Sequence, residues 1–168
     1  MSDCCSLGDS SKAPAVMACP VNGVRSKQVD MLTVKSLVRQ LPLGMSKTQY
    51  YFCEAPGCDA VYFPLDAQAP LFRCGDLTVR VGVKETADPI PVCYCFGFTR
   101  KNIQDEIAKT GRSTIGERIT VEVKAGNCGC EVKNPSGKCC LGSVAQVVKD
   151  CVRANQRSKI EVGQGDRP

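Results

Sequence analysis

The sequence predicts an α+β protein in which a β-rich half comes first and a helical half second, with the boundary near residue 88. Between residues 19 and 85, short runs of β-branched and aromatic residues alternate with Gly, Pro and Asp. After Val92 the apolar residues recur at helical spacing instead. Thirteen cysteines and an aromatic content of 5% indicate that disulfides or metals support a thin apolar core.

Four short strands are expected in the first half, because β-branched and aromatic residues are enriched there between turn-forming residues. They are residues 33–38, 49–53, 60–63 and 77–83.

Three helices are expected in the second half. Thr99 can cap a helix that carries Ile103 and Ile107 and ends at Gly111. Ser113 can cap a second, short helix with two isoleucines on one side. A last helix should begin near Cys139, where apolar residues recur at helical spacing. Its stripe is Leu141, Val144, Ala145, Val148, Cys151 and Val152.

The cysteines are expected to bind metal rather than to form disulfides. The N-terminus has no pattern of a secretory signal, and no apolar run approaches the length of a membrane span. A chain kept in the reducing cytosol retains free thiols for metals, and an odd cysteine count leaves one thiol outside any disulfide scheme. The absence of histidine excludes Cys₂His₂ fingers, Rieske centres and Ser–His or Cys–His catalytic sites.

The net charge of +5 is spread along the chain. No block of basic residues with interleaved aromatics suggests a nucleic-acid partner.

The first candidate metal site comprises Cys19, Cys53 and Cys58. The segments "ACPVNG" and "YYFCEAPGCDAVYF" look like the two knuckles of a zinc ribbon, in which cysteines in tight turns converge on one tetrahedral Zn²⁺. The second cysteine of a C-P-x-C knuckle is replaced by Asn22. The fourth ligand is left open between Cys4 or Cys5, Asp30 and water; otherwise the site is empty. We expect residues 1–18 to be a flexible arm and residues 19–88 a zinc-ribbon-like β module.

The second candidate site begins at the C-x-C pair Cys93 and Cys95. The segment "CYCFGFTRKNIQDEIAKTGRSTIGERI" joins this pair to two capped helical segments, and more cysteines follow. This order resembles the 2Fe–2S domain of bacterioferritin-associated ferredoxins. The resemblance implies a helical cluster-binding module of that type over residues 89–155, with a tail over residues 156–168. A 2Fe–2S cluster needs four thiolates, two for each iron.

A narrower resemblance comes from four separate segments in order: "YYFCEAPGCDAVYF", "TVRVGVKE", "PVCYC" and "NPSGKCC". Together they resemble the N-terminal domain of CopZ-type copper chaperones, which joins a zinc-binding β module to a 2Fe–2S module. The resemblance implies Cys93, Cys95, Cys130 and Cys140 as cluster ligands. The M-x-C-x-x-C loop of the heavy-metal-associated domain that follows in those chaperones does not occur in these 168 residues.

The resemblance also implies a function in metal homeostasis. We expect a cytoplasmic 2Fe–2S and zinc protein that reduces Cu²⁺ to Cu⁺ and supports a metal-transporting P-type ATPase, more an electron-transfer protein and metallochaperone than a classical enzyme. One alternative is a non-redox carrier of Cu⁺ or Hg²⁺, with Cys4 and Cys5 as the capture site. Another is a ferredoxin that docks on a reductase or an iron store.

The remaining cysteines are assigned as follows. Cys74 and Cys151 are expected to pack in the core, since free cysteines are often buried as small apolar residues. The roles of Cys128 and Cys139, which neighbour two expected cluster ligands, stay open.

Overall fold

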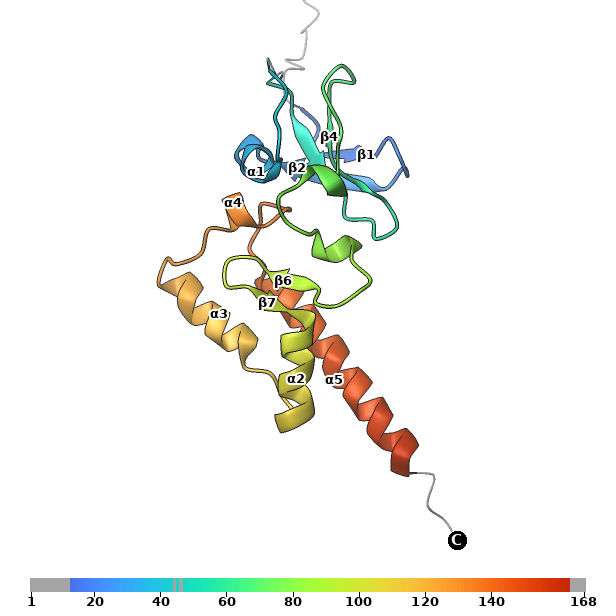
Figure 1. Ribbon diagram of the computed structural model, residues 1–168, viewed down its shortest axis with the longest axis vertical. Coiled ribbons are helices and arrows are strands. Elements are labelled where there is room, and N and C mark those ends of the chain that lie inside the picture. The colour runs from blue at the N-terminus through green and yellow to red at the C-terminus, as the bar shows by residue number, and fades with distance from the viewer. Residues whose placement is uncertain (1–12, 44, 46, 164–168) are drawn as a thin grey trace, which may run out of the picture.

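The computed structural model describes residues 13–43, 45 and 47–163 and places an antiparallel sheet at one end of the molecule and helices at the other (Figure 1). The five strands of the sheet pair in chain order, each beside the one before it. They are β1 (Val16–Ala18), β2 (Arg25–Val29), β3 (Tyr50–Phe52), β4 (Ala60–Pro64) and β5 (Phe72–Arg73). The mixed α and β composition with a β-rich first half is as predicted.

Two of the four expected strands are confirmed. Residues 49–53 contain β3 and residues 60–63 lie within β4. Tyr51 stacks on its cross-strand partner Phe63 with ring centroids 5.5 Å apart. Such aromatic pairs contribute up to about 1 kcal/mol each to sheet stability, which explains why these aromatic segments form strands.

The predicted strand at residues 33–38 is wrong, because this segment lies mainly in helix α1 (Met31–Leu37). The Asp30 side chain accepts a hydrogen bond of 2.7 Å from the Leu32 N–H and so caps the helix. The β-branched residues Thr33 and Val34 are buried. Val34 packs in the core that includes β3, and the Thr33 hydroxyl donates to the Glu131 carbonyl, so these contacts outweigh the low helix propensity of both residues.

The predicted strand at residues 77–83 is also wrong. Only Leu77 pairs with another segment, through a single bridge to Val38. The chain then forms a 3₁₀ turn, η2 (Gly82–Lys84). A Cβ at Gly82 would lie 2.1 Å from the Pro91 carbonyl oxygen, so the close approach of two backbones takes the place of regular pairing.

The helical half follows the predicted order. Thr99 caps α2, and Gly111 ends it with φ of +79°. The last helix runs on through Gly163, past residue 155, where the sequence analysis places the start of a tail. The other elements are η1 (Cys74–Asp76), β6 (Pro91–Cys93), β7 (Phe98–Thr99), α2 (Arg100–Thr110), α3 (Ile115–Lys124), α4 (Cys130–Lys133) and α5 (Leu141–Gly163). No helix among the described residues is long and apolar enough to cross a membrane.

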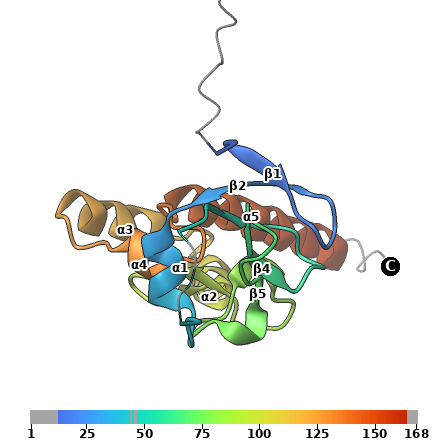
Figure 2. The same ribbon diagram turned by 90° about the horizontal axis from the view of Figure 1, so that it is seen from above.

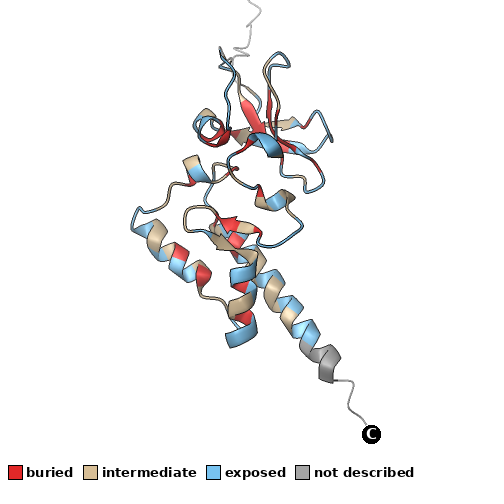
Figure 3. Cartoon of the chain, in the orientation of Figure 1, coloured by how far each residue is buried: buried red, intermediate tan, exposed pale blue. Residues whose placement is uncertain are grey.

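Buried residues gather on both faces of the sheet and on the inner faces of the helices (Figure 3). Alternate residues of β3 face opposite sides: Tyr50 and Phe52 belong to the core that includes α1, whereas Tyr51 and Cys53 belong to the core on the other face. A third core fills the helical half. The two halves meet where α1 contacts α4, as the view along the long axis shows (Figure 2).

Candidate metal centres

Cys19 lies in the tight turn between β1 and β2. Its N–H donates to the Val24 carbonyl at 2.9 Å, and its own carbonyl accepts from the Gly23 N–H at 2.8 Å. Gly23 has φ of +74°, which side-chain-bearing residues rarely adopt. The turn thus folds the chain back on itself and leaves the Cys19 side chain buried.

Cys53 follows β3 directly, and Cys58 lies two residues before β4. The Cys53 N–H donates to the Val61 carbonyl at 2.9 Å, which continues the β3–β4 pairing into this turn. The Lys84 ammonium donates to the carbonyls of Ala55, at 3.0 Å, and of Cys58, at 2.8 Å. The η2 turn therefore supports the second knuckle from outside.

The sulfur atoms of Cys19, Cys53 and Cys58 all lie within 4.8 Å of one another, and all three residues are buried. Zinc–thiolate bonds of about 2.3 Å with tetrahedral angles place ligand sulfurs about 3.8 Å apart, so this spacing fits one zinc ion. Within residues 13–43, 45 and 47–163, it is the only group of three or more His, Cys, Asp or Glu side chains this compact. The two knuckles thus converge as the sequence predicts.

The fourth ligand is not supplied by another described cysteine or carboxylate. Asp30, one of the expected alternatives, uses its carboxylate to cap α1. Cys4 and Cys5, the other protein candidates, lie outside the described residues. Asn22 does reach the site, and its side-chain nitrogen lies 3.5 Å from the Cys53 sulfur.

The pKa values of the knuckle thiols move in opposite directions. Burial raises the pKa of Cys19. Burial also acts on Cys53, but the backbone at Ala55, the Asn22 side chain and the positive charge of Lys84 outweigh it, so that the pKa of Cys53 lies below its usual value. Lys84 and Asn22 therefore favour the thiolate form of Cys53.

The four cysteines expected to hold a 2Fe–2S cluster come from three separate segments. Cys93 ends β6, and Cys95 lies in the turn before β7. Cys130 is the first residue of α4, and Cys140 directly precedes α5. The Cys95 and Cys130 sulfurs lie 3.6 Å apart, and Cys93 and Cys140 belong to the same buried core. The structure therefore brings Cys95 next to Cys130 and places Cys93 and Cys140 together in the interior of the helical half.

The surroundings of these thiols are apolar. Cys93 and Cys140 belong to the core of the helical half, which also contains four isoleucines of α2 and α3. Burial, with the neighbouring Cys95 thiol, raises the pKa of Cys130 to about 12. Burial and the Cys93 thiol raise the pKa of Cys140 as well. Four thiolates in such a pocket need a cationic metal to offset their charge.

The spacing also bears on the number of metal ions. Among the described residues, no three of these four sulfurs lie within 4.8 Å of one another. A single tetrahedral ion would need that compactness, whereas a 2Fe–2S cluster takes two thiolates on each of two irons. The Gly129 N–H donates to the Cys95 sulfur at 3.3 Å, a contact of the kind that tunes such clusters. The residues present therefore fit a 2Fe–2S cluster.

Two hydroxyl groups of the sheet half hold the segment that carries Cys130 and Cys140. The Thr33 hydroxyl donates to the Glu131 carbonyl at 2.6 Å, and the Tyr62 hydroxyl donates to the Pro135 carbonyl at 2.8 Å. No motif in the sequence predicts either contact. The one signal that could have pointed to the first contact is the position of Thr33 between the apolar residues Leu32 and Val34.

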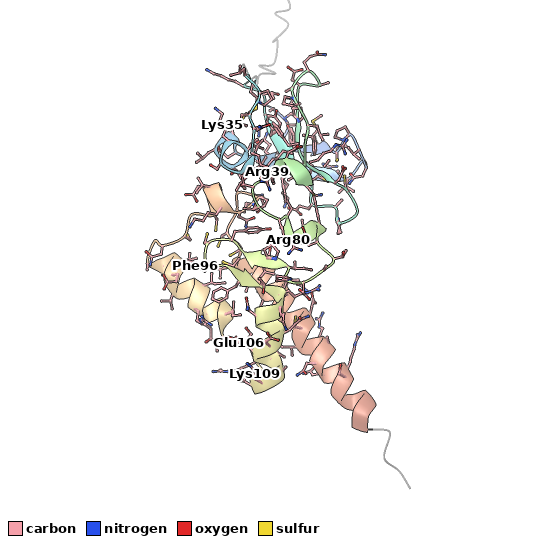
Figure 4. All side chains as sticks on the ribbon, viewed as in Figure 1. Lys35, Arg39, Arg80, Phe96, Glu106 and Lys109 are labelled. Atoms are coloured by element: carbon pink, nitrogen blue, oxygen red, sulfur yellow. The ribbon has the colours of Figure 1, made fainter. Side chains whose placement is uncertain are left out.

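Tyr94 lies between Cys93 and Cys95, two of the cysteines expected to hold a cluster, and connects them to η2. Its hydroxyl accepts from the Gly82 N–H at 2.8 Å and donates to the Arg80 carbonyl at 3.1 Å. The Arg80 guanidinium in turn donates to the Pro89 carbonyl at 2.8 Å. Figure 4 shows Arg80 in the segment between the sheet and β6. The C-x-C pair is thus held from the same turn whose Lys84 supports the second knuckle.

The remaining described cysteines differ in exposure. Cys74 and Cys151 are partly buried against the cores of the sheet half and the helical half, as expected for packing residues. Cys128 is half-buried before α4, and Cys139 is exposed beside Cys140.

Comparison with known proteins agrees with a zinc-binding first half of the chain. A family described as a zinc binding domain, of the CopZ type, matches residues 16–78. The copper chaperone CopZ of Archaeoglobus fulgidus is 37% identical over 127 residues, which cover 74% of this chain and 58% of that protein. The chain thus spans somewhat more than half the length of this curated relative.

A solved structure extends the likeness beyond the zinc-binding part. The crystal structure of the N-terminal domain of Archaeoglobus fulgidus CopZ superposes with a TM-score of 0.63 at 34% identity, covering 78% of this chain and 97% of that domain. An alignment that covers nearly all of the domain includes both halves of the fold. The chain therefore belongs to the family of CopZ-type N-terminal domains.

Proposed function

We propose that this protein binds a 2Fe–2S cluster through Cys93, Cys95, Cys130 and Cys140 and a structural zinc ion through Cys19, Cys53 and Cys58. In this proposal it is a cytoplasmic metallochaperone that transfers electrons. The single observation that supports the cluster is the contact of the Cys95 and Cys130 sulfurs beside an apolar core that contains Cys93 and Cys140.

The copper chemistry of the proposal rests on the relative's name, copper chaperone. A bound 2Fe–2S cluster supplies electrons one at a time, which matches the one electron that converts Cu²⁺ to Cu⁺. A reduced flavoprotein or another one-electron donor would supply that electron. The Cu⁺ formed is the ion that soft thiolates prefer, and a metal-transporting P-type ATPase would receive it.

The residues of this chain have defined tasks in the proposal. The four cluster cysteines hold the redox centre in a pocket where the Gly129 N–H offsets part of the charge on Cys95. Phe96 and Phe98 lie beside this pocket and are half-buried, so they limit the access of water to it. Phe96 projects near α3 in Figure 4. The zinc module supports the cluster segment through Thr33 and Tyr62.

Anaerobic purification followed by visible absorption spectroscopy and by iron, sulfide and zinc assays tests this function. We expect a coloured protein with two irons and two sulfides for each zinc. A colourless protein without sulfide would contradict the cluster.

Cysteine-to-serine variants sharpen the test. Cys140→Ser should lose the visible spectrum, since it removes one of the four thiolates proposed to hold the cluster. Cys151→Ser is the matched control, because Cys151 packs against the same core but is not among the four. An equal loss in both variants would indicate a folding defect rather than loss of a ligand.

A further inference from the structure

The Asn22 side chain occupies the position at which a C-P-x-C knuckle has its second cysteine. Its oxygen accepts a hydrogen bond of 2.9 Å from the Val24 N–H, and its nitrogen lies 3.5 Å from the Cys53 sulfur. The Val24 N–H can only donate, so it fixes the orientation of the amide. Asn22 therefore directs an N–H toward the site and keeps its oxygen for the backbone.

This orientation makes Asn22 a hydrogen-bond donor to a ligand rather than a ligand itself. An amide N–H carries no lone pair for a metal, and Zn²⁺ takes its ligands from thiolate, imidazole or carboxylate groups. An N–H near a thiolate sulfur withdraws charge from it, as partners outside the ligand shell commonly do.

The tip of the first knuckle, which includes Asn22, is exposed to solvent. Cys19, Cys53 and Cys58 are 6% exposed or less, whereas Asn22 is exposed and the neighbouring Val21 is 48% exposed. Three sulfurs thus cover the buried side of a tetrahedral ion. A small molecule from solution could approach its remaining side along the tip of the first knuckle.

We propose that zinc is held here by three thiolates, with Asn22 as a donor to Cys53, and that a small exchangeable ligand from solution completes the coordination. Water would be the resting ligand, and neutral nitrogen donors or small thiols would displace it. The inference deepens the zinc part of the proposed function and does not depend on the cluster.

Cobalt substitution tests this proposal on the full chain. Co²⁺ replaces zinc, and its visible bands report the number and type of ligands; a difference spectrum against the zinc-loaded protein removes any absorption by a cluster. We expect added imidazole to shift the bands of the wild-type protein. In Asn22→Cys, a fourth thiolate should abolish this response and tighten zinc binding by about tenfold or more.

The Asn22→Ala variant separates the donor role from the open position. It should keep the imidazole response, while the thiolate-to-cobalt charge-transfer band shifts because Cys53 loses its N–H donor. An unchanged band would overturn the donor role of Asn22.

A wild-type spectrum that does not respond to imidazole would overturn the proposal of an exchangeable fourth ligand, because the protein itself would then supply the fourth donor. If Co²⁺ gives no thiolate bands at all, the zinc part of the proposed function fails. That result is distinct from a bound but unresponsive ion.

Discussion

The thiols near the proposed cluster differ sharply in their surroundings at the scale of single residues. Cys130 and Cys140 are 6% and 2% exposed, and burial together with a neighbouring thiol raises the pKa of each. Cys139, next in the chain to Cys140, is exposed. Reactivity toward alkylating reagents follows the thiolate form and its access to solvent.

In the metal-free protein we therefore expect iodoacetamide at pH 8 to modify Cys139 well before Cys130 and Cys140. Peptide mapping by mass spectrometry at successive times measures the order. In unfolded protein the three thiols should react at similar rates. Equal rates in the folded protein would contradict the buried positions.

Ionisation of Tyr50, in the sheet half, should make the stability of the protein depend on pH. Burial raises its pKa from 10.0 to about 12. The folded protein thus retains a proton that the unfolded chain releases, so the stabilising effect is complete below pH 10 and is lost as the pH rises toward 12. We expect the free energy of unfolding to fall over this range, as measured by urea titration with circular dichroism.

The Tyr50→Phe variant is the control for that measurement. It removes the ionisable hydroxyl, which donates to the Pro70 carbonyl at 3.0 Å, and keeps the ring that stacks on Phe72. Its stability should fall less between pH 10 and 12 than that of the wild-type protein. An identical fall would show that other groups account for the loss.

At the scale of elements, the contact between α1 and the segment from α4 to α5 connects the two halves. Gly137 has φ of +67°, and a Cβ there would lie 2.7 Å from the Thr33 hydroxyl oxygen. That hydroxyl is the donor to Glu131, one residue beyond Cys130. Any side chain at 137 therefore displaces the group that positions a proposed cluster ligand.

We expect Gly137→Ala to destabilise the protein by about 2–3 kcal/mol, through backbone strain and the displaced hydroxyl, and to lower the iron and sulfide content. Gly126→Ala is the matched control. Gly126 has φ of +77°, but nothing lies within 4 Å of its Cβ position, so only the strain of about 1 kcal/mol applies. Similar effects of the two substitutions on the iron and sulfide content would exclude a role of the Thr33 hydroxyl in positioning Cys130.

At the scale of the whole molecule, the sheet half contacts both segments that carry the proposed cluster ligands. Tyr94 connects the C-x-C pair to η2, and Lys84 of η2 donates to two carbonyls of the second zinc knuckle. Thr33 and Tyr62 donate to the carbonyls of Glu131 and Pro135, in the segment that carries the other two proposed ligands. The proposed zinc ion thus stabilises the surface against which the cluster segment folds.

Removal of zinc should therefore speed the loss of the cluster. We expect a zinc chelator with little affinity for iron to shorten the half-life of the visible spectrum under argon. Tyr62→Phe should also shorten it, even with zinc present, because the donor to Pro135 is lost. A half-life that zinc removal leaves unchanged would show that the two centres are independent.

The parts of this fold that sequence can predict are those set by local pattern. The cross-strand aromatic residues of 49–53 and 60–63 and the Thr99 and Gly111 caps of α2 are read directly from neighbouring residues. Residues 33–38 were predicted wrongly because their β-branched character favours a strand, whereas Asp30 and burial against the sheet favour a helix.

Contacts between distant residues could not be predicted in this way. The sequence did predict that Cys19, Cys53 and Cys58 lie close together, because ribbon knuckles have a recognisable local sequence, and the structure places their sulfurs within 4.8 Å of one another. The Thr33 contact to Glu131 joins residues 98 positions apart, and the Tyr62 contact to Pro135 joins residues 73 positions apart. Neither has a local signature, because each depends on how the two halves dock.

The chain-order pairing of the sheet has a consequence for biosynthesis. All five strands are complete by Arg73, and every ladder joins strands that are neighbours in the chain, so the sheet can form as the chain leaves the ribosome. Cys130 and Cys140 are synthesised much later. The nascent chain would therefore acquire zinc first, and a finished zinc-loaded platform would await the assembly machinery that delivers iron and sulfide.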